Sequence, residues 1–117
     1  MKADLTILRV AGALARHGAE RHALTAVNVA NADTPGYRAR DVEPFTDAFR
    51  RQQASGDGTA LRTRTVETLG SASPNGNTVS VEDQMMRAGE AARSSEIATT
   101  IFTKTIALLR AAAARPR

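Results

Sequence analysis

The stretch NVANADTPGY, residues 28–37, decides how this chain folds, because it closes a long alanine-rich segment with a tight turn. Pro35 fixes its φ at about −65°, which suits the first central position of such a turn, and Gly36 accepts a positive φ at the second. Thr34 precedes proline and is therefore disfavoured in the α region. These local constraints predict that a helix ends near Asn31 and that the chain then turns sharply.

The segment that leads into this turn, about residues 4–31, is predicted to be one helix. Its stripe of small and apolar residues alternates spacings of three and four, the pattern of a heptad repeat. The stripe consists of Leu5, Leu8, Gly12, Ala15, Ala19, His22, Ala26 and Val29. Gly18 lies off the stripe, and each glycine inside a helix costs roughly 1 kcal/mol relative to alanine. We therefore expect packing partners, more than intrinsic propensity, to hold this helix.

A second long helix is predicted for about residues 81–114. The same alternation of four and three runs through Val81, Met85, Ala88, Ala92, Ser95, Thr99, Phe102, Ile106, Leu109 and Ala113. A repeat sustained over this length is typical of a coiled-coil strand. Ser80, followed three residues later by Asp83, resembles a capping box and predicts where this helix begins.

The residues between the two helices, about 32–79, follow no sustained period. Glycine and serine clusters indicate loops, and residues 61–69 give only a weak signal for a short β-ribbon. A connection this long without structure is uncommon in a compact domain. It predicts a middle segment that is disordered in the free chain or ordered by neighbouring molecules.

The predicted fold class is mainly all-α. Long N- and C-terminal heptad helices pack as a coiled-coil-like pair or bundle, with an irregular or weakly β middle segment. The expected single domain comprises an N-terminal core helix in residues 1–32, a turn and loop-rich segment in 33–79, and a C-terminal core helix in 80–117. The sequence leaves open whether the two stripes pack against each other in one chain or between chains.

Charge and composition narrow the function classes. The 117 residues carry 16 Lys and Arg against 12 Asp and Glu, a formal net charge of +4, and no cysteine. Disulfides and cysteine-ligated metals are thereby excluded within this chain. A basic balance raises nucleic acid as a partner, and a small basic helical nucleic-acid-binding protein is our alternative function. However, the charges are scattered and aromatic residues are few, so we expect no nucleic-acid partner.

No arrangement of residues predicts catalysis. His17 and His22 are five residues apart, about 140° around a helix, so they do not converge on one metal ion. His22 lies on the stripe and is expected to be a packed or hydrogen-bonding histidine. Neither a Ser-His-Asp arrangement, nor paired carboxylates, nor a phosphate-binding loop is recognisable. We therefore expect no enzyme, no cofactor, no metal and no small-molecule substrate.

The turn motif and the start of the second helix together resemble a known family. The motif, formed by Asn28, Ala30, Asn31, Thr34, Pro35, Gly36 and Tyr37, resembles the signature of bacterial flagellar basal-body rod and hook proteins. The stretch GNTVSVEDQM, residues 76–85, resembles the opening of the terminal helix in the small proximal rod proteins. This resemblance implies a structural subunit of the rod, needed for motility, whose terminal helices line a tube. It also implies self-association and contacts with other rod proteins, the export-gate adapter and the membrane ring.

The resemblance further implies a route and a location. Such a subunit is made in the cytoplasm, exported by the flagellar type III apparatus without signal-peptide cleavage, and assembled in the rod that spans the periplasm. The N-terminus imitates a signal peptide, but Asp4 and Arg9 interrupt its apolar region. No apolar run approaches the roughly 20 residues of a transmembrane helix.

Several residues have two interpretations. Asn28 and Asn31 either only end the helix, or also bond a neighbouring subunit and fix its register. Tyr37 either covers the turn or anchors a subunit contact. Phe45 and Phe49 follow Pro44 and share one face of a short predicted helix. They form either a small hydrophobic clasp or, by resemblance to early flagellar export substrates, a docking site for the export gate.

Overall fold

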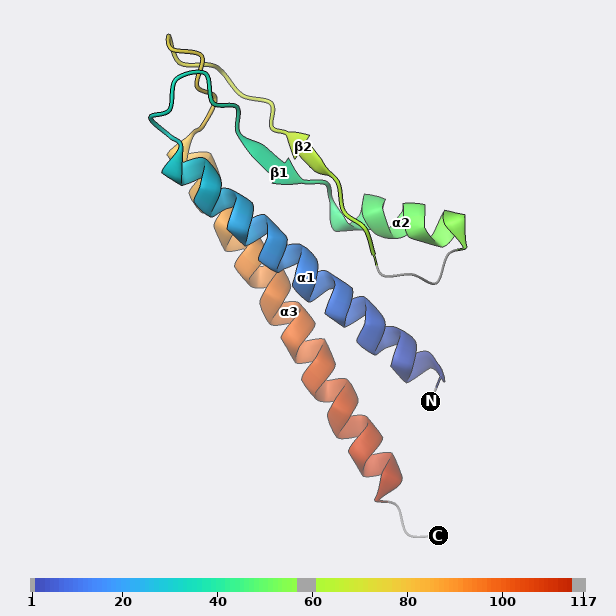
Figure 1. The fold of residues 1–117 in the computed structure, drawn as a ribbon. Coiled ribbons are helices and arrows are strands. Elements are labelled where there is room, and N and C mark those ends of the chain that lie inside the picture. The colour runs from blue at the N-terminus through green and yellow to red at the C-terminus, as the bar shows by residue number, and fades with distance from the viewer. Residues whose placement is uncertain (1, 57–60, 115–117) are drawn as a thin grey trace.

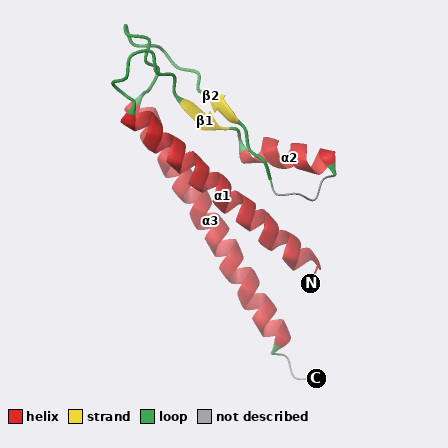
Figure 2. Ribbon diagram, in the orientation of Figure 1, coloured by secondary structure: helices red, strands yellow, loops and turns green. Residues whose placement is uncertain are grey.

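Two long antiparallel helices form the body of the molecule, and a small middle segment lies along one side of them (Figure 1). This computed structural model describes residues 2–56 and 61–114. The helices are α1, Lys2–Ala30, α2, Phe45–Ser55, and α3, Val81–Ala113, and the strands are β1, Arg40–Val42, and β2, Thr65–Glu67. Extents of 71 × 28 × 15 Å describe an elongated shape. The predicted mainly α fold with a weakly β middle is confirmed (Figure 2).

The turn after α1 has the predicted geometry. The Tyr37 amide donates to the Thr34 carbonyl oxygen over 3.2 Å, with Pro35 and Gly36 at the two central positions. Gly36 has a φ of 73°, which a residue with a Cβ rarely adopts. At the start of α3, the Ser80 side chain accepts a hydrogen bond from the Asp83 amide, as the capping pattern indicates.

The contact between α1 and α3 lies one residue out of phase with the predicted stripes. The buried line on α1 contains Ala11, Gly18 and Thr25, and the buried line on α3 contains Gln84, Ala91, Ala98 and Thr105. As a description of packing within one chain, the predicted stripes are therefore wrong. Small residues let the two backbones approach closely, and alanine occurs in both phases, so periodicity alone does not select the buried one.

The predicted stripe residues are largely exposed on the single chain. Met85 is 69% exposed and Leu5 is 56% exposed. Exposure is also substantial at Val29, Val81 and Phe102. Leu8, Ile106 and Leu109 are half-buried. His22 is exposed as well, and the packed histidine is instead His17.

Gly18 and Gly12 exchange the roles that the sequence predicts for them. A Cβ on Gly18 would lie 2.7 Å from the Ser95 Oγ and 3.2 Å from the Ala91 carbonyl oxygen. A Cβ on Gly12 would meet nothing within 4 Å. Gly18 therefore belongs to the closest approach of α1 and α3, whereas Gly12 has open space beside it.

This difference gives a matched pair of variants. Gly12→Ala is expected to raise the free energy of unfolding by about 1 kcal/mol, because alanine favours the helix and clashes with nothing. Gly18→Ala gains the same propensity but pushes against the Ala91 carbonyl, and we expect a net loss of roughly 1 kcal/mol. Urea unfolding followed by circular dichroism measures both values. Equal stabilisation by the two alanines would contradict the placement of Gly18.

The middle segment is ordered against α1 of the same chain. Strands β1 and β2 pair antiparallel, with Asp41 opposite Val66. Ala39, Val42 and Ala48 are buried beneath the ribbon and α2. The expectation of a middle that needs neighbouring molecules for order is thus wrong for the described residues. Residues 57–60, within the predicted loops, lie outside the described residues.

Candidate functional site

Asn28 is the centre of a buried polar hub at the turn end of the molecule. Its side chain is fully buried. Its Nδ2 donates to the Arg40 carbonyl oxygen over 2.7 Å and to the Gln84 Oε1 over 2.9 Å. Its Oδ1 accepts hydrogen bonds from the Tyr37 hydroxyl at 3.0 Å and from the Arg40 amide at 3.2 Å. Because an amide side chain has two donors and two lone pairs, Asn28 is saturated within its own chain.

The other motif asparagine, Asn31, acts locally. Its Nδ2 donates to the Val27 carbonyl oxygen over 2.8 Å, and its Oδ1 accepts from the Thr34 hydroxyl. The turn is held from outside by Asn77, whose Nδ2 donates to the carbonyl oxygens of Asn31 and Thr34 over 2.9 and 2.8 Å. Asn77 thus ties the end of α1 to the segment that precedes α3.

A charged cluster continues the hub along α1. Asp41 is only 5% exposed. It accepts from the Arg21 Nε at 3.1 Å and from the Arg87 Nη1 at 2.6 Å. Arg21 also reaches Glu90, and Arg87 also reaches Asp83. Burial lowers the pKa of Arg87, but hydrogen bonds to Asp83 and Asp41 outweigh it, so the net shift is upward and the guanidinium stays charged.

A second ion pair fastens α2 to the base of the ribbon. Glu43 is buried and accepts two hydrogen bonds from the Arg51 guanidinium, at 2.6 and 2.8 Å. These bonds are the largest cause of a lowered pKa at Glu43, which stays ionised. The Glu43 carbonyl oxygen accepts from the Nε2 of buried His17 over 2.7 Å. His17 is therefore a structural donor between α1 and the middle segment.

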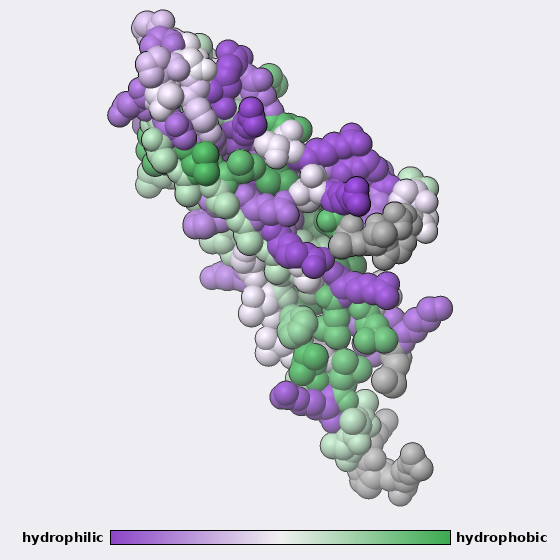
Figure 3. All heavy atoms as spheres, viewed as in Figure 1, coloured by the Kyte–Doolittle hydropathy of each residue, from purple (hydrophilic) through white to green (hydrophobic). Residues whose placement is uncertain are grey.

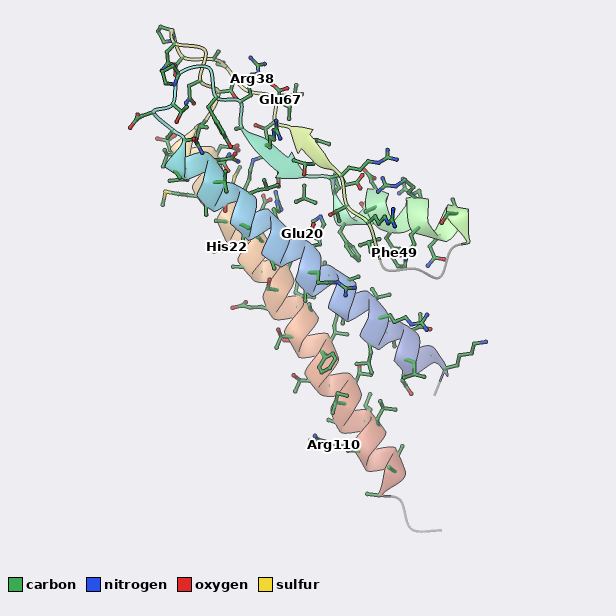
Figure 4. The ribbon with its side chains drawn as sticks, viewed as in Figure 1. Glu20, His22, Arg38, Phe49, Glu67 and Arg110 are labelled. Atoms are coloured by element: carbon green, nitrogen blue, oxygen red, sulfur yellow. The ribbon has the colours of Figure 1, made fainter. Side chains whose placement is uncertain are left out.

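Phe45 and Phe49 share a face of α2, as predicted. Their rings stack with centroids 5.8 Å apart, and the Phe45 ring meets the His17 ring edge-on at 5.7 Å. Both phenylalanines are half-buried. Figure 4 shows Phe49 on the helix that lies beside α1. In the folded chain the pair therefore forms the hydrophobic clasp.

A half-open groove of about 440 Å³ lies between α1, α3 and the middle segment. Its charged lining consists of the paired Arg21, Asp41, Arg87 and Glu67, and its apolar lining includes Leu14 and Phe45. Among residues 2–56 and 61–114, no group of three or more His, Asp or Glu residues is placed to hold a metal ion. The described part of the chain also contains no helix long and apolar enough to cross a membrane.

The side of the helix pair that faces away from the middle segment is an open face. His17 precedes the buried Gly18 by one residue and contacts the middle segment. Residues that follow a buried residue of α1 or α3 by one position, such as Ala19 and Ala92, lie on the opposite side of their helix. Figure 4 shows His22 and Phe49 on opposite sides of α1, and Figure 3 shows apolar residues gathered along the long helices. The open face comprises Leu5, Leu8, Ala15, Ala19, Ala26 and Val29 of α1, and Val81, Met85, Ala92, Phe102, Ile106 and Leu109 of α3. Both predicted stripes thus reappear together on one surface.

Comparison with known proteins gives a partial match. Over 43 residues, the chain is 42% identical to the flagellar basal body rod protein FlgB of Escherichia coli strain K12. Part of this chain is similar to a flagellar rod protein. FlgB of Shigella flexneri matches to the same extent, and each match covers 37% of this chain and 31% of the relative's length. No protein-family model matches the chain.

Of the residues of the resembling motif, Asn28 and Tyr37 bond in the hub, whereas Asn31 bonds locally to Val27 and Thr34. The sequence did not indicate the buried partners Gln84, Asn77 and Asp41. A single amide or carboxylate within a helix or loop does not change the hydrophobic periodicity, so periodicity does not reveal it. Only the resemblance of the GNTVS stretch, residues 76–80, drew attention to Asn77.

Proposed function

We propose that this chain is a structural subunit of the flagellar basal-body rod, assembled through the open face of α1 and α3 in support of bacterial motility. The observation that carries the proposal is the open face itself. The chain satisfies the side chain of Asn28 internally, yet leaves apolar side chains such as Met85 and Phe102 in solvent. The partial similarity to FlgB supports a role in the flagellar rod.

The energetics suit an assembly in which each subunit touches several others. Burial of apolar surface contributes about 25 cal/mol per Å², so one shallow contact by alanines and a few larger residues is weak. Several such contacts made at once are strengthened by effective concentration. A subunit of this composition therefore associates stably only within a multivalent array.

Partners and route belong to the same proposal. The chain contacts further copies of itself, other rod proteins, the export-gate adapter and the membrane ring, and it needs no cofactor. It leaves the cytoplasm through the flagellar type III apparatus without signal-peptide cleavage and joins the rod spanning the periplasm. The export gate binds Phe45 and Phe49 before the chain folds, since folding half-buries both rings. Phe45→Ala should then accumulate in the cytoplasm, and its normal secretion would remove the docking step.

The decisive experiment is fractionation of the cell that makes this protein. The chain should co-purify with basal bodies, and cryo-electron microscopy should place it in the rod. Met85→Glu and Phe102→Glu should be made and exported normally but be absent from basal bodies, because each places a charge on the open face. Ile97→Glu, an exposed change on the side of α3 opposite the open face, is the matched control and should assemble. Recovery of the wild-type chain with nucleoid, bound in a salt-dependent way, would instead support the nucleic-acid alternative.

A further inference from the structure

We propose that the outer edge of α3 in one copy contacts the outer edge of α1 in the next, so that identical chains stand side by side in a row. This inference rests on the proposed function and names the partner of the open face. The outer edge of α1 contains Leu5, Arg9, Gly12, Arg16 and Ala19. The outer edge of α3 contains Glu82, Met85, Gly89, Ala92, Glu96 and Ile106. Most of these residues are exposed, and Gly12 and Ile106 are half-buried.

The two edges lie on opposite rims of the helix pair. Gly12 and Ala19 follow the buried line of α1 by one residue, and Arg16 precedes buried Gly18 by two. These offsets place them roughly 100° to 160° around α1 from the face that meets α3. Ala92 and Glu96 are offset in the same way from buried Ala91 and Ala98 on α3. A contact between unlike edges cannot close on itself in one pair, so it repeats from copy to copy.

Two glycines inside the helices point to a missing neighbour. Gly12 and Gly89 weaken their helices relative to alanine, and a Cβ on either would meet nothing within 4 Å in this chain. Gly18, in contrast, is explained by the close approach of α3. Since the one described mid-helix glycine that has a neighbour marks a tight helix contact, we assign Gly12 and Gly89 the same role against another copy.

Charge selects another copy as that neighbour. The outer edge of α1 presents the cations Arg9 and Arg16, seven residues apart, and the outer edge of α3 presents the anions Glu82 and Glu96. Pairing α1 of one copy with α3 of the next brings Arg16 to Glu96, a pair of opposite charges. Large apolar residues on the same edges, Leu5 on one and Met85 on the other, are covered in the same contact.

The register within the chain predicts the register between copies. In one chain Asn28 lies across from Gln84, and Arg21 lies across from Glu90. A neighbour that stands beside it without a shift along the helix axes repeats these offsets. Arg16 then lies across from Glu96, and Ala19 lies across from Ala92. Leu5 meets Ile106 near one end, where the like charges Lys2 and Arg110 remain solvated.

Cysteine pairing tests this arrangement directly, because the chain contains no cysteine of its own. Ala19→Cys and Ala92→Cys are made in separate full-length chains, mixed at high concentration and oxidised. We expect disulfide-linked heterodimers of the two variants. Ile97→Cys, on the opposite side of α3 because Ile97 precedes buried Ala98 by one residue, is the control and should not link to Ala19→Cys. Linkage of Ala19→Cys only to itself, or equal linkage to the control, would overturn the proposal.

Charge reversal gives an independent readout by sedimentation. Arg16→Glu and Glu96→Arg are each expected to weaken self-association by about fivefold to tenfold, and the double variant should recover most of the loss. Absence of rescue would also contradict the register. A chain that co-purifies with basal bodies yet shows neither linkage nor rescue would refute this contact and leave the rod function standing. A chain that links as expected but is absent from basal bodies would support this contact and refute the rod function.

Discussion

Replacing Asn28 with alanine is expected to lower the free energy of unfolding by about 3 to 5 kcal/mol. The substitution removes four hydrogen bonds from a side chain without solvent exposure. It also leaves the buried Gln84 Oε1 without its partner and removes the side-chain partner of the Arg40 backbone groups, and each buried unsatisfied group costs roughly 1 to 3 kcal/mol. The Tyr37 hydroxyl can turn towards water, so the total loss stays below the sum of the costs of the separate groups. Urea unfolding of the purified chain measures the loss.

Asn31→Ala is the matched control, since it deletes the same kind of side chain from the turn that directly follows α1. Asn31 is half-buried and bonds only the Val27 carbonyl oxygen and the Thr34 hydroxyl through its side chain, in contacts open to solvent. We expect a loss of about 1 kcal/mol or less. If both asparagines gave the same loss, Asn28 would not be the hub that joins α1, β1 and α3.

Asp41→Ala is expected to cost about 3 kcal/mol. This carboxylate is 5% exposed and shared by Arg21 and Arg87, so its removal leaves two partly buried guanidiniums facing each other. Breaking a buried pair by deleting one partner typically costs 3 to 5 kcal/mol, and we take the lower end because each arginine keeps a second carboxylate. Unfolding in urea and amide exchange of β1 report the change, and exchange should rise first at β1.

An exposed pair in the same ribbon supplies the comparison for Asp41. Glu67→Ala removes the ion pair between Glu67 and Arg38. The Glu67 side chain is 51% exposed and the Arg38 side chain is 60% exposed. Such pairs contribute roughly 0 to 1 kcal/mol, and added salt reduces that further. A loss at Glu67 as large as that at Asp41 would mean that burial of the Asp41 cluster has little energetic effect.

Features that depend on neighbouring residues were predicted from the sequence, whereas contacts between distant parts of the chain were not. The turn at Pro35 and Gly36 was predicted correctly because it depends on backbone sterics of adjacent residues. The long helices were predicted because their periodicity extends over many turns. The phase of their contact was missed, since Ala11 and Gly12 are both small and only packing distinguishes them. The partners Gln84, Asn77 and Asp41 were missed because they meet α1 from distant parts of the chain.

The order of the middle segment was missed for a related reason. Its buried apolar residues are few and small, as at Ala39 and Ala48, so hydropathy gives little signal. Polar contacts hold it instead, chiefly through Asp41, Glu43 and His17, and none of these contacts follows a helical or strand period. The candidate surface was found only as two separate stripes, and the antiparallel fold brings them onto one side.

The hydrogen bond between Asn28 and Gln84 joins residues 56 positions apart, so it also sets a sequence of events in time. A polypeptide that emerges from its N-terminus, at a ribosome or through a narrow pore, presents α1 long before Gln84 follows. Until then Asn28 has no partner on α3, and contacts of such long separation form late because the intervening chain must first be closed into a loop. The native hub therefore forms only after the middle segment and the first turn of α3 have also emerged.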